Sequence, residues 1–295
     1  MCSTEPTRRQ ALRRGTLGAA GLLALHGCGQ SLDSVQVVPV SPTAGTSRPA
    51  PSNTTVGTAP LAAEVPEARV APDGSVEVMP GLNINPRSVW GAELPPKSAF
   101  EIETVRFLLV HHTASSNNYD DPLTVIQNTH VFHTSAAKNW GDVAYHFFVA
   151  RDGSVWEGRA GSLDGPVVAD ASGGNQGWAQ LVCLIGNHVQ QAPTPAAQAS
   201  LVQVLKWLTW RYRLDTDPAA TTDYVSRGSD KYPAGTAVTT PIISGHRDAT
   251  YTACPGDAAY HLLPTWRQQV AAMPDPVFVQ TGRYPPAEQL GLIEP

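Results

Sequence analysis

Only one part of this 295-residue chain has the apolar patterning that a folded domain needs. Residues 29–84 are rich in Pro, Ser, Thr, Ala and Gly and show no apolar periodicity. Such a segment buries too little apolar surface to offset its ordering entropy, so we expect a flexible tether, with only a weakly indicated hairpin at its end. One sizeable domain is therefore expected at residues 85–273, followed by a tail at residues 274–295.

The first 28 residues have the features of an export signal. Arg8 and Arg9 precede a mildly apolar run at residues 15–27, which is too short to span a bilayer as a helix. The arginine pair resembles a twin-arginine signal, and the sequence LHGC that ends at Cys28 resembles a lipoprotein box. We therefore expect export to the cell envelope and a lipid on Cys28 that anchors the protein to a bacterial membrane. A cleaved secretory signal with an incidental cysteine is the alternative.

The charge of the chain argues against one class of partner. The formal net charge is −5, and the first 28 residues are themselves basic, so the rest of the chain is more acidic still. An acidic protein lacks the electrostatic footprint that binds the phosphates of nucleic acid. No nucleic-acid partner is expected.

Three stretches of the domain read as strands. VRFLLVHH, residues 105–112, is a continuous apolar run, which is typical of a strand buried on both faces. LVCLIGN, residues 181–187, is a second short buried strand. AYHFFVARDGSVWEGR, residues 144–159, predicts a hairpin, because two β-rich runs flank the turn-forming pair Asp152-Gly153.

Helical patterns separate these strands. The clearest helix follows Thr194, which can cap it, with Pro195 in the first turn. Its apolar positions recur at helical spacing: Leu201, Val204, Leu205, Leu208 and Tyr212. Residues 120–133 and 258–270 are expected to be helical too, the latter interrupted at Pro264, whereas residues 215–240 read as a loop. The sequence thus predicts an α/β fold, with a mixed central β-sheet flanked by helices.

The cysteines and histidines of the domain allow several chemistries. Cys183 and Cys254 could form a disulfide in an exported protein, or Cys254 could be a nucleophile with a histidine base. A metal site is the third possibility. His111 and His112 close a buried strand, and His246 and Cys254 lie in a turn-rich segment that could fold over the edge of that strand.

The metal interpretation agrees best with the donor types. Two imidazoles and a thiolate suit zinc, and three protein ligands leave one tetrahedral position for water, as a hydrolase requires. A purely structural zinc site would usually need a fourth protein ligand. Because strand side chains alternate between faces, only one of His111 and His112 can point to the metal, although alternation alone does not say which.

Four motifs, in order, resemble a known family: FLLVHHTA, WGDVAYHFFVARDGSVWEGR, LVCLIGN and ISGHRDATYTACPGD. The chain from about residue 86 to 270 is similar to the zinc N-acetylmuramoyl-L-alanine amidases of the peptidoglycan recognition protein and phage-lysozyme family. That resemblance implies a mixed sheet with zinc in a surface groove. It also implies a protein that acts on peptidoglycan and cuts the amide bond between N-acetylmuramic acid and the L-alanine of the stem peptide. We expect the protein to be a monomer.

The resemblance also assigns roles to individual residues. It implies that His111, His246 and Cys254 bind Zn²⁺ and that Tyr145 lies beside the metal, where its hydroxyl can stabilise the developing oxyanion. Thr252 stands where phage members carry a lysine, so it can donate a hydrogen bond but brings no positive charge.

Two further residues match positions on the wall of the family's groove. An aromatic face at Trp140 suits a sugar ring, and the imidazole of His133 can hydrogen-bond to a stem peptide. Packing or surface roles are the alternative for both. The rival function is a non-catalytic peptidoglycan-binding receptor of the same fold. Receptors of that kind commonly lack the cysteine ligand, so the presence of Cys254 and Tyr145 favours the enzyme.

Overall fold

The computed structural model describes residues 73–97 and 100–276. Every described residue belongs to one compact unit within residues 61–295. The expected export signal, Cys28, most of the expected tether and nearly all of the expected tail therefore lie outside the described residues. Within the described part, no helix combines the length and the apolar character needed to cross a membrane.

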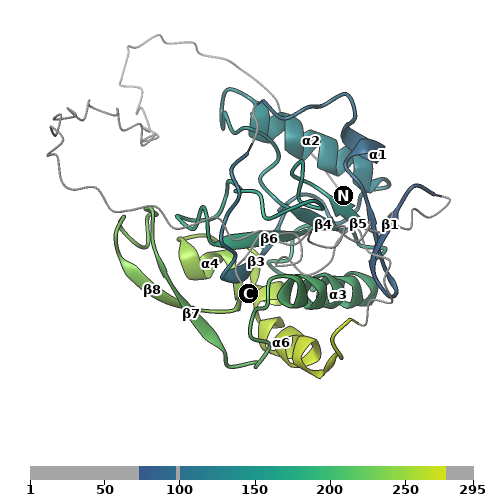
Figure 1. Cartoon of the computed structure of the whole chain (residues 1–295). Coiled ribbons are helices and arrows are strands. Elements are labelled where there is room, and N and C mark those ends of the chain that lie inside the picture. The colour runs from purple at the N-terminus through teal and green to yellow at the C-terminus, as the bar shows by residue number, and fades with distance from the viewer. Residues whose placement is uncertain (1–72, 98–99, 277–295) are drawn as a thin grey trace, which may run out of the picture. The chain divides into compact units, whose positions relative to one another are not determined.

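A mixed seven-stranded sheet forms the centre of the described domain (Figure 1). Its strands, in spatial order, are β1 Val76–Met79, β2 Leu82–Asn85, β5 Val155–Glu157, β4 Phe147–Val149, β6 Ala179–Leu184, β3 Phe107–His112 and β9 Ile243–Gly245. β3 pairs in parallel with β6 and β9, whereas β4 and β5 form the predicted antiparallel hairpin. The predicted strands and the α/β class are confirmed.

Strand alternation divides the core into two layers. Leu108 and Val110 of β3 belong to one buried cluster, and Phe107 and Leu109 belong to another on the opposite face. Every residue of β3 is buried, which agrees with a central strand covered on both sides. The register of β3 therefore determines which of its last two residues reaches each face.

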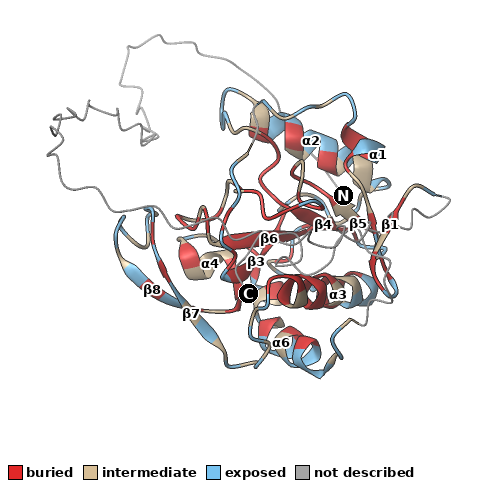
Figure 2. Cartoon of the chain, viewed as in Figure 1, coloured by how far each residue is buried: buried red, intermediate tan, exposed pale blue. Residues whose placement is uncertain are grey.

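Helices cover both faces of the sheet (Figures 1 and 2). α3 Pro195–Arg211 and α6 Leu263–Ala272 pack on the face of Leu108. α1 Ser88–Gly91 and α2 Pro122–Thr134 lie on the face of Phe107, with Trp90 and Ile126 in that core. Two one-turn helices, α4 His246–Ala249 and α5 Asp257–Tyr260, follow β9.

The predicted cap and apolar stripe of α3 are confirmed. The hydroxyl oxygen of Thr194 accepts a hydrogen bond from Ala197 N at 3.1 Å, and Pro195 occupies the first turn. All five residues of the predicted stripe are buried: Leu201, Val204, Leu205, Leu208 and Tyr212. Full burial of one leucine contributes about 1.5–3 kcal/mol, so this stripe fixes α3 against the sheet.

The boundary between tether and domain was predicted too late in the chain. Residues 76–84, assigned above to the end of the tether, supply β1 and most of β2, which form the weakly indicated hairpin, and β2 also pairs in parallel with β5. The side chains of Val78 and Ile84 are fully buried in the sheet core. Strands of four residues are too short to give a strong periodic signal, which explains the error.

Residues 215–240 are not the simple loop that the sequence predicted. They contain most of an antiparallel ribbon, β7 Thr221–Val225 and β8 Ala237–Pro241. The outer faces of this ribbon are largely exposed (Figure 2), but Tyr224 and Val238 are buried in the core layer of Phe107. One buried residue in five on β7 and two in five on β8 give too weak an apolar pattern to be recognised as strands from the sequence alone.

The C-terminal helical segment also differs in detail. Two helices, α5 and α6, are separated by residues 261–262. Pro264 lies in the first turn of α6, where a backbone N–H would have no helical hydrogen-bond partner in any case.

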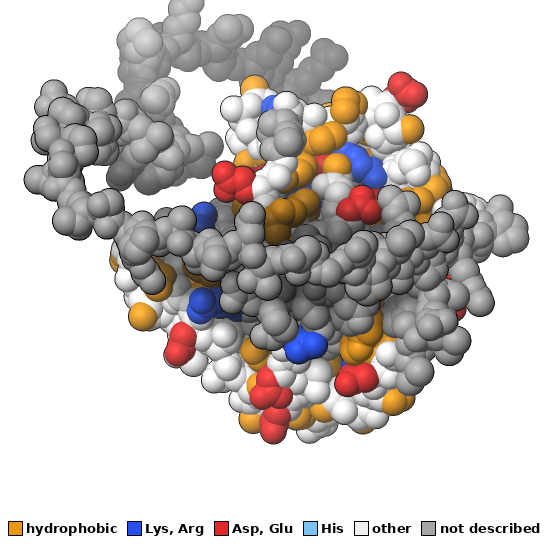
Figure 3. Space-filling model, viewed as in Figure 1, with side chains coloured by type: hydrophobic (Ala, Val, Ile, Leu, Met, Phe, Trp, Pro, Cys, Tyr) orange, Lys and Arg blue, Asp and Glu red, His pale blue; other side chains and the backbone are white. Residues whose placement is uncertain are grey.

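On the face shown in Figure 3, acidic and basic side chains of the described residues are interspersed.

Candidate metal centre and groove

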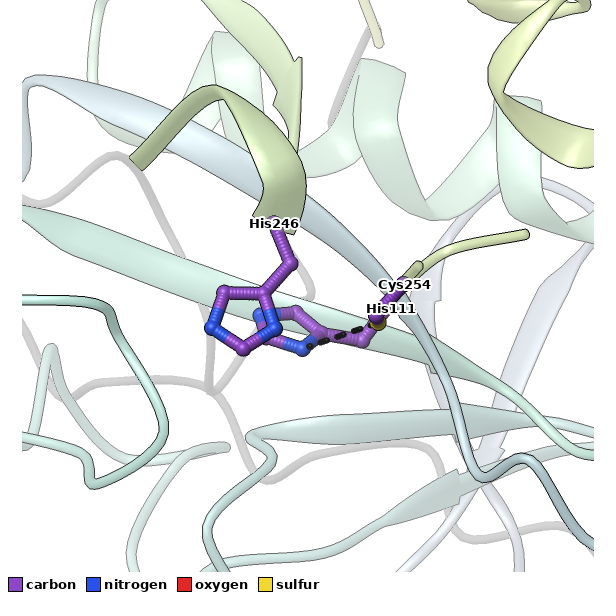
Figure 4. A group of neighbouring side chains, drawn as sticks. All are labelled: His111, His246 and Cys254. Carbon is purple, nitrogen blue, oxygen red and sulfur yellow. Dashed lines mark hydrogen bonds between the residues drawn. The ribbon is translucent and has the colours of Figure 1, made fainter. Parts of the chain in front are cut away.

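Parallel pairing of β3 and β9 brings the candidate ligands together. His111 is near the carboxyl end of β3, and His246 directly follows β9 as the first residue of α4. Because the strands are parallel and adjacent, their carboxyl ends meet at the same edge of the sheet. The chain then turns back and places Cys254 beside His111 (Figure 4).

The three side chains form a compact donor set. Cys254 Sγ lies 3.6 Å from His111 Nδ1, and one potential ligand atom from each of His111, His246 and Cys254 lies within 4.8 Å of the others. The two imidazole rings are 4.3 Å apart between centroids. In a tetrahedral zinc site, with Zn–N about 2.1 Å and Zn–S about 2.3 Å, neighbouring N and S ligands are about 3.6 Å apart. These residues could therefore hold a metal ion.

The alternation of β3 selects His111 over its neighbour. His111 follows Phe107 and Leu109 on the face of α2, and its Nε2 is buried without a hydrogen bond to any described residue. His112 points to the other face, where its Nδ1 accepts a hydrogen bond from His188 N at 3.1 Å. Of the two histidines, His111 is thus the one that lies with His246 and Cys254.

A row of aromatic side chains, Tyr145, His133 and Trp140, lies beside the donor set. The ring centroid of Tyr145 lies 5.1 Å from that of His111 and 5.4 Å from that of His133, and His133 packs edge-on against Trp140 at 4.7 Å. His133 Nδ1 accepts a hydrogen bond from Ala144 N, which leaves Nε2 as the protonated nitrogen of the neutral ring. All of these side chains except buried His111 line one open groove.

The groove has a volume of about 570 Å³ and runs between α2 and the segment that carries Cys254. The sequence-predicted residues that line it are His133, Trp140, Tyr145, His246, Thr252 and Cys254. This volume is within the range of ligand-binding clefts. The structure therefore brings all seven predicted site residues to one place, with His111 buried in contact with Cys254.

The order of these residues along the chain follows a known family pattern. The family described as N-acetylmuramoyl-L-alanine amidase (Amidase_2) matches residues 102–257, more than half of the chain. The chain belongs to this family. The matched residues include His111, His246 and Cys254, so the whole donor set of this amidase-family domain lies within the match.

Relatives of this amidase-family chain have two kinds of name. Mouse peptidoglycan recognition protein 1 is 29% identical over 192 residues, which cover 62% of this chain and 87% of the mouse protein. Human N-acetylmuramoyl-L-alanine amidase is 29% identical over 218 residues, which cover 70% of this chain and 33% of the human protein. Mouse peptidoglycan recognition protein 3 is 26% identical, and the match spans 45% of its length.

Solved structures of the same two kinds resemble the chain. Bumblebee PGRP-SA gives a TM-score of 0.49 at 19% identity and covers 63% of this chain and 95% of its own. The N-acetylmuramoyl-L-alanine amidase LysC of Clostridium intestinale gives a TM-score of 0.43 at 19% identity, with 59% and 92% covered.

Burial determines the protonation of the donors. It holds the pKa of His111 well below its usual value and lowers that of His246 to about 4, so both imidazoles are neutral at pH 7, the form that binds metals. Burial also raises the pKa of the Cys254 thiol to about 12. A thiolate at neutral pH therefore needs a neighbouring cation, which a bound metal would supply.

The remaining interpretations of the cysteines are less well supported by the geometry. Cys183 and Cys254 are both free thiols, so the structure contains no disulfide between them. Contact between Cys254 and His111 would also suit a cysteine nucleophile, but Cys254 is only 8% exposed and a third donor, His246, faces the pair. A nucleophile needs access to substrate more than it needs a second imidazole.

Two polar residues of the ligand segment organise its backbone. The hydroxyl of Thr252 lines the groove and accepts a hydrogen bond from Cys254 N at 3.2 Å, and its own proton is available to donate. Asp248 accepts hydrogen bonds from Gly245 N at 2.8 Å and Tyr260 Oη at 2.6 Å. Asp248 therefore stabilises the turn around His246 and does not orient a ligand imidazole directly.

Sequence reasoning missed two residues of the groove wall. Phe132 is 52% exposed on α2 and lines the groove beside His133. The ammonium of Lys138 lies 5.7 Å from the Phe132 ring centroid and 5.1 Å from that of Trp140. The aromatic residue directly before a predicted site histidine, Phe132 before His133, is the sequence signal that could have drawn attention to this wall.

Proposed function

We propose that this protein is a peptidoglycan hydrolase, an N-acetylmuramoyl-L-alanine amidase that cuts the amide bond between the lactyl group of N-acetylmuramic acid and L-alanine. The observation that carries the proposal is the His111, His246 and Cys254 donor set, in which His246 and Cys254 line an open groove and His111 is buried beside them. Its donor types and spacing fit Zn²⁺. Bound there, zinc would supply a Lewis acid and would lower the pKa of water.

The chain's own groups provide the rest of the site. Burial raises the pKa of Tyr145 well above its usual value, so its hydroxyl stays protonated and can donate to an oxygen on which negative charge develops. Thr252 offers a second hydroxyl in the lining of the groove. His133 and Trp140 form a wall on which a stem peptide and a sugar ring could be held in register with these donors.

The alternative is a receptor of the same fold that binds peptidoglycan without cutting it. Both kinds of protein occur among the relatives, so family membership does not separate them. A complete His–His–Cys set favours hydrolysis, because a receptor would not need a thiol whose ionisation requires a cation beside it.

Mass spectrometry of digested peptidoglycan tests the proposal. Purified protein loaded with Zn²⁺ would be incubated with two peptidoglycans that differ in the third residue of the stem. Hydrolysis at the proposed bond releases free stem peptides with an L-alanine amino terminus and leaves unsubstituted lactyl groups on the glycan. Binding of peptidoglycan without release of stem peptides from either substrate would establish the receptor instead.

We further propose that the protein works in the cell envelope, held to a bacterial membrane through a lipid on Cys28. The signal-like segment and the Pro/Ser/Thr-rich stretch that follows it support this location. A tether of that composition would let the domain reach its polymeric substrate from the membrane surface.

A further inference from the structure

The carbonyl groups at the C-terminal end of α4, the helix that carries His246, need hydrogen-bond donors from outside the helix. α4 has only four residues, and its last carbonyl groups, those of Arg247, Asp248 and Ala249, have no intrahelical partner. These carbonyls lie between His246 and Cys254. How they are satisfied therefore determines how firmly residues 246–254, here called the ligand loop, are held.

Partners for these groups come from the connection between β7 and β8. Lys231 Nζ donates to Arg247 O at 2.9 Å and to Asp248 O at 3.0 Å, and Ser229 Oγ donates to Ala249 O at 2.8 Å. A positive charge at a helix C-terminus is also favourable to the helix dipole.

Asp230 completes the contact on the next two residues. Its Oδ1 accepts hydrogen bonds from Tyr251 N at 3.0 Å and from the hydroxyl of Thr250. Three consecutive residues, 229–231, thus bind five consecutive residues of the ligand loop, 247–251. We call residues 229–231 the clamp.

The clamp is itself fixed to the core. Tyr224 of β7 is buried and packs on Phe107 of β3, with ring centroids 5.2 Å apart. The connection is braced further by Ser226 Oγ, which donates to Tyr232 O at 3.0 Å, and by Arg227 N, which donates to Gly174 O at 2.8 Å. A continuous series of contacts therefore runs from the central strand through the ribbon to the ligand loop.

We propose, on the basis of the zinc site proposed above, that Asp230 and Lys231 are positioning residues that hold His246 and Cys254 at the spacing zinc requires. Neither residue lines the groove. They act through the backbone on which both ligands are mounted. The β7–β8 ribbon is thus part of the metal centre's support, in addition to any effect on substrate choice.

Zinc affinity, measured by competition with a chelator well below the melting transition, tests the clamp. Lys231→Met keeps the aliphatic stem and removes the donors, and Asp230→Ala removes the acceptor. Each should raise the Kd for Zn²⁺ about 10–100-fold, the usual effect of losing an outer partner of a metal ligand. Asp230→Asn keeps an acceptor oxygen and should bind zinc within about threefold of the wild type. A general loss of stability would not change affinity in folded protein.

Thr239→Ala is the matched control, because it removes a hydrogen bond of 2.6 Å to Asp223 from the same ribbon without touching the ligand loop. It should leave the Kd unchanged. The positioning role of the clamp is contradicted if the Kd values of Lys231→Met and Asp230→Ala equal that of this control. It is also contradicted if Asp230→Asn binds zinc as weakly as Asp230→Ala. In both cases the proposed zinc site itself remains supported. If the wild type itself does not bind zinc, the proposed function and the clamp fall together.

Discussion

Two adjacent histidines in β3 have different environments because a strand turns each successive side chain to the opposite face. His111 joins the donor set, whereas His112 accepts a backbone hydrogen bond from His188. At the scale of single residues, the site is therefore specified by the register of one strand. A shift of that register by one residue would place His112 beside Cys254 and send His111 toward α3.

Cys254→Ser should abolish hydrolysis and weaken zinc binding strongly, because a hydroxyl at this position is a much poorer zinc ligand than a thiolate. The change removes one buried sulfur from the edge of the core, so the fold should survive. Zinc content by mass spectrometry of metals and circular dichroism would check both points. Cys183→Ala, a matched change at a buried thiol outside the donor set, should retain zinc. Full activity of zinc-free Cys254→Ser protein would rule out the mechanism.

Tyr145→Phe should lower kcat and kcat/KM together by about 10²–10³-fold, the usual effect of removing one oxyanion donor. The ring remains, so its packing on His111 and His133 should persist, and zinc content should not change. Steady-state kinetics on a soluble muropeptide would measure the effect. Tyr212→Phe, which removes a buried hydroxyl in the core layer on the opposite face of the sheet, is the control. Turnover of Tyr145→Phe within about twofold of wild type would make Tyr145 a wall residue only.

At the scale of elements, one side of the groove could be predicted from the sequence and the other could not. α2 and the strand before it have strong patterns, and their positions agree with the sequence prediction. The ligand loop and the clamp have none, because their order comes from contacts between residues about twenty positions apart, such as Asp230 with Tyr251. The sequence could therefore identify the donors, but the support that holds them is visible only in three dimensions.

Gly256→Ala should destabilise the protein more than Gly235→Ala. Both glycines have positive φ, +91° and +85°, so both changes carry a backbone strain of about 1–3 kcal/mol. A Cβ on Gly256 would lie 2.2 Å from the backbone carbon of His188, whereas one on Gly235 would meet no atom within 4 Å. Urea denaturation should show the additional loss at residue 256. Equal losses in the free energy of unfolding for the two variants would contradict this, because they would mean that the backbone at His188 can move away from the added Cβ at little cost.

At the scale of the whole molecule, the proposed membrane anchor makes a separate prediction. Wild-type protein should sediment with membranes and incorporate labelled fatty acid, whereas Cys28→Ala should remain unprocessed or be released. Replacing Arg8 and Arg9 by lysine should block export if the twin-arginine route is used, because lysine conserves charge but not the arginine pair. Cys183→Ala should not alter labelling. If the wild-type protein does not incorporate labelled fatty acid, the proposed lipid on Cys28 is wrong.

The candidate ligands also connect the inner strand β3 with the edge of the sheet at β9. β9 is an edge strand of three residues, and it pairs only with β3. His111 and Cys254 are 143 positions apart, so an ion shared between them would act as a reversible cross-link that closes a very long loop. Opening of β9 and α4 should then require release of the ion, and amide hydrogens there should exchange faster when a chelator is present. When metal is scarce, local unfolding should therefore begin at β9 and α4, while the core layer around α3 stays folded.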